Sequence, residues 1–502
     1  MFRDSFLLRS LLVYGLCLPL ALFLGYLIAS PNGLLGYAII GLIMMVLVTP
    51  ILLRWHHLLL ILAWNSYLIV FFLPGQPSLG VVAAAVSLCL VLLTRTMHRR
   101  DAALHVPSVA RPLILIAIVV VVTARLTGGI GGQAIGAEAW GGKKYLGVFG
   151  AIMGYFALVA ERISRNHTRF YAYAFVLSST TALVSDIAYA LGPKFYFLFS
   201  FFSVGTAVTQ AVSQETLLRL SGVSFAAMSG YSFMLMYYGI RGICNLTKPW
   251  RLIVFLSLAA ASLFGGYRSA LILILLISLI QFYLEGLFRS RLLIFFALGA
   301  ILVATGMVAF SDKLPLSVQR SLSFLPLQVH PSAKFDAQTT LDWRLEMWRL
   351  VVKEIPTYLF LGKGFAYSGT DYYLTQEAVR RGLYHAYEDT LISGTYHQGI
   401  LTLLVPFGIL GLVGFLWFCW ESLKVLLANY RYGENSLRTV NCFLLAHFVA
   451  RLVFYLIFYG QFDQDLMIFT GIIGLSVSLN GGMKLQRQDE SAIPVATSHE
   501  TA

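Results

Sequence analysis

The chain has 502 residues, of which 58% are apolar and only 12% charged, and its formal net charge is +13. The charged fraction is about half that of a typical water-soluble domain, which argues against a soluble fold. The positive charge does not indicate a nucleic-acid partner, because Lys and Arg fall in short gaps between apolar runs rather than in one phosphate-binding patch.

Apolar segments recur along the chain, many of them close to the roughly 20 residues that cross a bilayer as a helix. Fourteen such segments lie at about 11–29, 34–53, 58–73, 79–94, 112–127, 145–160, 170–187, 221–240, 252–266, 269–284, 292–310, 397–420, 439–460 and 465–480. The first begins like a signal peptide, but its apolar run is too long for a cleavable one, so we expect it to be retained. A further apolar piece, FYFLFSFFSV within 188–220, is either a half-span or an interfacial helix. These segments predict an all-α polytopic membrane protein with about 12–14 transmembrane helices.

The basic residues between these segments indicate the orientation of the chain. Alternate gaps contain Arg or Lys, for example Arg95, Arg111, Arg162, Arg169 and Arg289, whereas the short gaps 30–33 and 74–78 contain none. Cytoplasmic loops are enriched in Lys and Arg, so we place the N-terminus and the basic gaps in the cytoplasm. The long gap after the eleventh segment is then outside the cytoplasm.

That long gap, residues 311–396, differs from the others because its nine basic and nine acidic residues make it neutral. A connection of this length is typical of a structured unit or a lid. It contains a helical piece, LDWRLEMWRLVVKEI, which we expect to end at Pro356, and then a glycine-punctuated turn, LGKGF. The predicted organisation is N-terminal spans over 1–310, the large extracytoplasmic loop over 311–396, C-terminal spans over 397–480 and a disordered cytoplasmic tail over 481–502.

Three cationic residues are predicted at the outer ends of the spans. Arg219 precedes the eighth span, Arg268 lies in a short turn between the ninth and tenth, and His397 opens the twelfth. Guanidinium groups match phosphate oxygens bidentately, so pyrophosphate is the anion that such a set would suit. The alternative for each arginine is an interfacial anchor, and for His397 a helix cap or a surface residue.

Two ionisable residues fall at mid-depth in the thirteenth span, where a charge is costly and normally faces a partner or a cavity. They are Arg451 and, one helical turn before it, His447. Asp186, in the seventh span, is a candidate partner for Arg451. A structural ion pair and a role in binding lipid phosphate both remain open for this arginine.

Other polar groups give weaker signals. His385, Glu388 and Asp389 could act as acids or bases in the large loop, although a solvated loop surface explains them as well. Asp463 and Asp465 are two acids in a short turn, which is a weak indication of a cation site. The chain has no phosphate-cradling glycine loop for a nucleotide. We therefore expect neither a metal nor a cofactor.

With these residues the sequence resembles the bacterial O-antigen ligase and polysaccharide polymerase superfamily of membrane glycosyltransferases, over roughly residues 215–420. The resemblance rests on five pieces in order. They are RLSG at Arg219, YRSA at Arg268, LPLSVQRSLSFLP at 314–326, WRLEMWRLVVKEIPTYLFLGKGF at 343–365 and YHQGILTLLVPFGILGLVG at 396–414. The expected architecture is similar to the GT-C class of glycosyltransferases.

The resemblance implies a metal-independent reaction at the outer face of the bacterial plasma membrane. A glycan linked to undecaprenyl pyrophosphate would pass to a hydroxyl of a glycan or lipid A-core acceptor. Arg219 and Arg268 would hold the pyrophosphate, and His397 would orient or deprotonate the acceptor or help to bind phosphate. Arg344 and Trp348 would belong to a loop helix that closes over the site.

Arg320, within the third piece, and Arg451 complete the candidate substrate-binding residues. The expected partners are the lipid-linked donor, the acceptor, membrane lipid and other polysaccharide-assembly proteins, with no nucleic acid. The usual His-Asn of the family is His397-Gln398 here, and VSFAAMSG replaces the polar residues expected after RLSG. The first departure slightly favours a polymerase over a ligase.

A transporter or flippase of polysaccharides or lipid-linked sugars is the alternative. A transferase requires Arg219, Arg268 and His397 to converge on one cavity, whereas a flippase requires a polar path through the bilayer.

Overall fold

The computed structural model describes residues 50–98, 106–130, 139–212, 218–385 and 387–484, together with Ala21 and Gly25. The first predicted span, most of the second and the tail beyond Lys484 therefore lie outside the described residues. The chain divides into two compact units, Met1–His56 and His57–Ala502. Little of the first unit is described, so the architecture below is that of the second.

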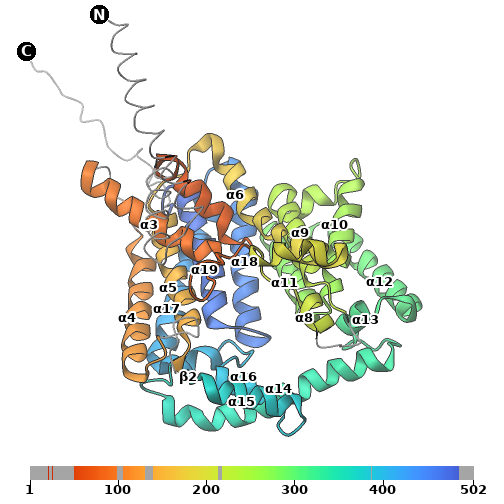
Figure 1. Ribbon diagram of the computed structural model, residues 1–502. Coiled ribbons are helices and arrows are strands. Elements are labelled where there is room, and N and C mark those ends of the chain that lie inside the picture. The colour runs from red at the N-terminus through yellow and green to blue at the C-terminus, as the bar shows by residue number, and fades with distance from the viewer. Residues whose placement is uncertain are drawn as a thin grey trace, which may run out of the picture. The chain divides into compact units, whose positions relative to one another are not determined.

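The second unit is built almost entirely of helices, which confirms the all-α prediction (Figure 1). Its main apolar helices are α3 (Leu79–His98), α4 (Pro107–Thr127), α5 (Gly142–Leu158), α9 (Ser221–Ile243), α10 (Trp250–Ala261), α11 (Arg268–Leu284), α12 (Leu292–Phe310), α17 (Leu401–Tyr432), α18 (Arg438–Ile457) and α19 (Phe462–Asn480). The seventh predicted span is a composite of α6 (Thr168–Leu177), the 3-10 helix η3 (Ser178–Ala182) and α7 (Leu183–Leu191).

Six helical stretches of the described residues are long and apolar enough to cross a membrane. They are Leu79–Thr96, Pro107–Thr127, Arg165–Leu191, Leu401–Tyr432, Asn435–Ile457 and Phe462–Asn480. Three further apolar helices, at Pro50–Trp64, Trp250–Gly265 and Arg268–Leu284, are shorter. The chain is therefore a multi-pass membrane protein.

The predicted span at 58–73 is wrong. Helix Pro50–Trp64 contains the expected gap 54–57 and ends at Trp64, after which the chain leaves the helix. Isolated bridges pair Leu68 with Phe202 and Ile69 with Ser78, so backbone groups are satisfied without a helix. A short apolar run does not by itself distinguish a helix from an extended segment.

The apolar piece at 195–204 forms no half-span. The 3-10 helix η4 (Pro193–Ser200) covers its first part, and Phe202 then pairs with Leu68.

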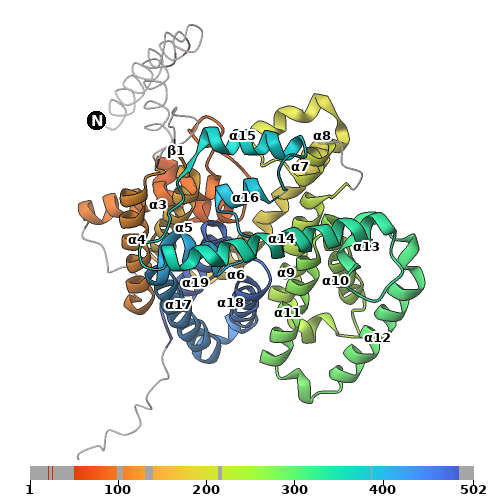
Figure 2. The same ribbon diagram turned by 90° about the horizontal axis from the view of Figure 1, so that it is seen from below.

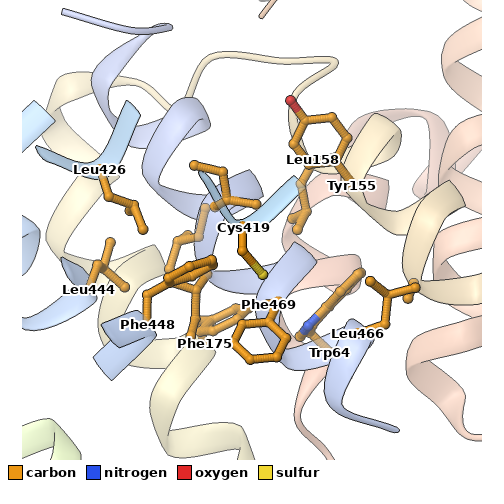
Figure 3. Close-up of a cluster of buried hydrophobic side chains, with 14 of the residues drawn as sticks. Trp64, Tyr155, Leu158, Phe175, Cys419, Leu426, Leu444, Phe448, Leu466 and Phe469 are labelled. Carbon is orange, nitrogen blue, oxygen red and sulfur yellow. The ribbon is translucent and has the colours of Figure 1, made fainter. Parts of the chain in front are cut away.

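The core of the unit depends on close packing against glycine. Trp64 fits between α5 and α19, where a Cβ atom on Gly154 or on Gly471 would come within 2.1 Å of its ring. Its indole N–H donates to the carbonyl of Met467 at 3.2 Å. Figure 3 shows Trp64 and Phe469 in this cluster of buried side chains.

The contact at Gly471 gives a stability prediction. We expect Gly471→Ala to destabilise the protein by about 1–3 kcal/mol, because the new methyl group would overlap the Trp64 ring in a packed core. Thermal unfolding of the purified protein in detergent measures the change. Gly306→Ala is the matched control, since a Cβ atom there meets nothing within 4 Å. Equal unfolding temperatures for the two variants would contradict the packing argument.

The segment 311–396 is folded. It contains α13 (Leu316–Leu322), α14 (Pro331–Tyr358), the strand β2 (Tyr367–Ser368), α15 (Gly369–Arg380) and α16 (Glu388–Ser393). β2 pairs antiparallel with β1 (Ala139–Trp140), with Ala139 opposite Ser368. In Figures 1 and 2, α14 lies across one end of the helical bundle, from α17 to α13.

Pro356 does not end the helical piece of this segment, because α14 continues to Tyr358. A proline in the last turn removes only one hydrogen bond, which the helix tolerates. The glycine-punctuated turn follows as predicted, with φ of 75° at Gly362 and 70° at Gly364. The N–H of Gly364 donates to the carbonyl of Pro406 at 2.9 Å, next to the kink of α17 at Gly408. The turn thus satisfies a carbonyl at the break in α17 and ties the end of α14 to that helix.

Candidate functional site

A cavity of about 300 Å³ lies where the start of α11 meets α13 and α14. It is lined by Arg219, Tyr267, Arg268, Ser269, Arg320, Thr340, Trp343 and Arg344. Four of these eight residues are arginines, contributed by four different segments of the chain. The cavity is therefore a concentration of positive charge, which favours an anion.

A tight turn before α11 makes room for two of the arginines. Gly266 has φ of 67°, and a Cβ atom there would lie 3.3 Å from the Arg219 side chain and 3.6 Å from that of Arg320. The backbone N–H of Arg219 donates to the side-chain oxygen of Gln210 at 2.9 Å, which fixes the chain just before α9. On the other side of the turn, Arg268 donates to the carbonyl of Ala337 in α14 at 2.7 Å. The turn and α14 thus hold these guanidinium groups in place.

Arg320 joins three elements through its guanidinium group. It donates to the carboxylate of Asp336, to the carbonyl of Gly266, and at 3.1 Å to the hydroxyl of Thr340. Its side chain is only 5% exposed. Asp336 also accepts from Arg219 at 3.5 Å. The contacts of Arg320 are thus with the protein itself, which suits a residue that holds α13 and α14 against the turn.

Arg344 has no counter-ion among the described residues, although it lines the cavity. Its buried Nε atom has no hydrogen-bond partner there, and neither Arg344 nor Arg268 forms an ion pair with a carboxylate of the described residues. Its guanidinium lies 5.5 Å from the ring centre of Trp343 and 5.8 Å from that of Tyr459. Burial, together with the neighbouring arginines, lowers the pKa of Arg344 from its ordinary value. A partly buried cation without a counter-ion is costly, and an anion in the cavity would offset that cost.

His397 lies beside the cavity rather than in its lining. Its ring packs edge-on against Trp343, with centres 5.7 Å apart, and stacks on Tyr459 at 5.5 Å. Its Nδ1 atom lies 3.4 Å from the amide nitrogen of Gln461. Its φ is 54°, a left-handed conformation that is uncommon outside glycine. Burial, with Arg344 and Lys144 nearby, lowers the pKa of His397 to about 4.

The residues on either side of His397 are fixed to the surrounding structure. The indole N–H of Trp348 donates to the carbonyl of Tyr396 at 2.7 Å. The side-chain oxygen of Gln398 accepts from the backbone N–H of Leu401 at 2.7 Å, at the start of α17. Gln398 therefore acts as a helix cap, and Trp348 orients the segment that carries His397.

The structure brings only some of the candidate residues together. Arg219, Arg268, Arg320 and Arg344 line the cavity. His397 packs against the lining residue Trp343, and Trp348 donates to the carbonyl of Tyr396, next to His397. Arg451 is not in the lining. It forms an ion pair with Asp465, at 2.9 Å from Nε and 2.6 Å from Nη2 to the same oxygen.

Two sequence-based suggestions need correction because the fold supplies different partners. Asp186 is not the partner of Arg451; its carboxylate accepts from the backbone N–H of Val223 at 2.8 Å. Asp465 forms the ion pair with Arg451, so only Asp463 remains of the two acids suggested as a cation site. Among the described residues no group of three His, Cys, Asp or Glu side chains could hold a metal ion.

Several residues near the site were not assigned to it from the sequence. Trp343 adjoins Arg344 in the same motif and could have been found there. Tyr459 and Gln461 lie in the short connection between α18 and α19, whereas the sequence prediction concerned only the two acids that follow, Asp463 and Asp465, which lie in the first turn of α19. Lys144, at the start of α5, carried no signal beyond its charge.

The fold and the cavity define a multi-pass membrane protein with a cavity lined by four arginines at one end of its helices. Residues 252–416 match the family model described as O-antigen ligase. The resemblance to that superfamily is thereby confirmed over this segment, which includes Arg268, Arg320, Arg344, Trp348 and His397. Arg219 and Arg451 lie outside the matched residues. No curated protein matches the chain.

Proposed function

We propose that this protein is a glycosyltransferase that moves a glycan from undecaprenyl pyrophosphate to an acceptor hydroxyl during assembly of a surface polysaccharide. The observation that carries the proposal is the excess of guanidinium groups in the cavity. Four arginines line it, and Asp336 is the one carboxylate that forms an ion pair with any of them among the described residues. A pyrophosphate would supply the missing negative charge and match the fork geometry of arginine.

In the proposed reaction the acceptor oxygen attacks the anomeric carbon of the donor sugar. The bond from that carbon to the pyrophosphate oxygen breaks, and the lipid pyrophosphate leaves with its electron pair. Arg268 and Arg344 stabilise the charge that develops on the leaving group. His397, neutral at pH 7, orients the acceptor hydroxyl or takes its proton. The arginines supply the positive charge that the leaving group needs, so we expect the reaction to be metal-independent.

We place the site at the outer face of the bacterial plasma membrane. The basic gaps between the spans mark the cytoplasmic side, and the large loop that helps to form the site is expected on the other side. Polymerase and ligase share this donor and differ in acceptor. The side chain of Gln398 caps α17, so its difference from the family pattern is a weak guide to the acceptor. Arg451 does not support the flippase alternative as part of a polar path through the bilayer, because it forms an ion pair with Asp465.

The test is transfer by the purified protein in lipid vesicles, with an undecaprenyl-pyrophosphate-linked glycan, a chelator and no nucleotide. We expect product to form, and His397→Ala to lose it without loss of expression. Product that lengthens without lipid A-core indicates a polymerase, and product that requires lipid A-core indicates a ligase. Full activity of His397→Ala would remove that residue from the proposed site.

The pH dependence of the reaction follows from the state of His397. A pKa lowered to about 4 keeps the imidazole neutral at pH 7, and the ring gains a proton only as the pH falls through that value. We expect the transfer rate to be insensitive to pH from neutral down to about pH 5 and to fall below it. Initial rates across this range measure the effect. An acidic limb centred on the ordinary histidine pKa of about 6.5 would contradict this environment for His397.

A further inference from the structure

Lys144 contacts the segment that leads to His397 from a distant part of the chain. It is the third residue of α5, outside the matched residues 252–416. Its ammonium donates to the carbonyl of Ser393 at 2.6 Å and to the hydroxyl of Thr395 at 3.1 Å. Both acceptors lie within four residues of His397. The N-terminal half of the chain thus reaches the loop that carries the histidine.

The hydrogen bonds of the Lys144 ammonium are made with this loop. The described residues provide it with no ion pair, although the carboxylate of Asp463 is close enough to interact electrostatically. Its ammonium also lies 5.4 Å from the ring centre of Phe365. Hydrogen bonds from a charged donor are stronger than neutral ones. The two bonds to residues 393 and 395 therefore connect α5 firmly to this loop.

The loop needs such ties because its backbone is held in an uncommon conformation. Gly394 ends α16 with φ of 68°, which glycine adopts readily, but His397 has φ of 54°, which is uncommon for a residue with a side chain. A left-handed non-glycine residue persists only where its surroundings over-determine it. Trp348 of α14 fixes the carbonyl of Tyr396, and Lys144 of α5 fixes Ser393 and Thr395. The loop is thus anchored from two sides.

We propose that Lys144 is a positioning residue for His397, which sets both the place and the electrostatic surroundings of the imidazole from outside the O-antigen ligase segment. The inference rests on the role of His397 under the proposed function. Lys144 itself touches neither the cavity lining nor the reacting groups.

The charge of Lys144 adds to that of one other cation near the histidine. The charged, polar and aromatic groups that face His397 are Arg344 and Trp343 from α14, Tyr459 and Gln461 from the turn after α18, and Lys144 from α5. Burial is the largest cause of the lowered pKa of His397, followed by Arg344 and then Lys144. We therefore expect removal of the ammonium to raise this pKa, while burial and Arg344 keep it below its ordinary value.

The experiment follows the imidazole directly, without substrate. Full-length protein labelled with carbon-13 histidine is titrated in lipid nanodiscs, and the NMR signal of His397 is identified by its absence in His397→Gln. We expect a midpoint near 4 for the native protein and for Lys144→Arg, and a higher midpoint for Lys144→Gln. Lys143→Gln is the matched control, because this neighbouring lysine is exposed and its loss should leave the midpoint unchanged.

Glycan-transfer assays on the same proteins test whether Lys144 positions the imidazole of His397. We expect Lys144→Gln to lower kcat by about tenfold or more with a smaller change in KM for the donor, since small misplacements of a reacting group have large effects. Thr395→Val removes the hydrogen bonds that the Thr395 hydroxyl accepts from Lys144 and from Ser393, but it removes no charge, so it should lower kcat and leave the midpoint near 4. An unmoved midpoint in Lys144→Gln, or wild-type kcat in both variants, overturns the inference. Full activity of His397→Gln would instead overturn the proposed role of the histidine.

Discussion

Replacing Arg268 or Arg344 with alanine is expected to lower the rate of glycan transfer by about 10²–10³-fold, the range typical for removing one group that stabilises a developing negative charge. Both side chains line the cavity, and neither forms an ion pair with a carboxylate of the described residues. Their charge is therefore available to a ligand. The double variant should lose less than the product of the two single losses, because both residues would act on one pyrophosphate.

Two controls separate this effect from a general loss of charge. Arg380→Ala removes an exposed arginine of α15 that pairs with Glu377, and we expect wild-type activity. Arg344→Lys keeps the charge but loses the planar fork, so it should restore only part of the rate. Transfer assays at matched protein levels provide the measurement. Wild-type rates in both alanine variants would exclude the cavity as the donor site.

The second large effect is expected on stability, at the ion pair between α18 and α19. Arg451→Met or Asp465→Leu should destabilise the protein by about 3–5 kcal/mol, because each leaves a poorly solvated charge without its partner. The Asp465 side chain is 2% exposed and that of Arg451 is 17% exposed. Unfolding of the purified protein in detergent measures the loss.

The double variant Arg451→Met/Asp465→Leu separates pairing from burial. Removing both charges leaves neither unpaired, so we expect most of the lost stability to return. Asp465 also accepts from the backbone N–H of Gln461 at 2.7 Å, and Gln461 approaches His397. The double variant should therefore regain stability but transfer more slowly than the native protein. If the double variant loses as much stability as the two single variants together, the two residues are not coupled.

Much of the architecture could be predicted from the sequence because a bilayer imposes a simple rule on composition. A helix in lipid must be apolar over a fixed length, so the predicted spans at 79–94, 112–127, 221–240 and 439–460 match α3, α4, α9 and α18 closely. The span at 58–73 failed because apolarity does not specify how backbone groups are paired. There the segment that pairs with it, near Phe202, is more than 130 residues away in sequence.

The candidate site divides in the same way. The sequence by itself determined which residues carry charge at span ends, and hence that Arg219 and Arg268 were candidates for one anion site. Only the tertiary structure decided that Arg320 is occupied by protein contacts, that Arg451 pairs with Asp465 and that Lys144 reaches the loop of His397. Charge and hydropathy are local properties of a sequence and can be read from it directly. Counter-ions and hydrogen-bond partners are chosen by the packing of distant helices, so the fold alone assigns them.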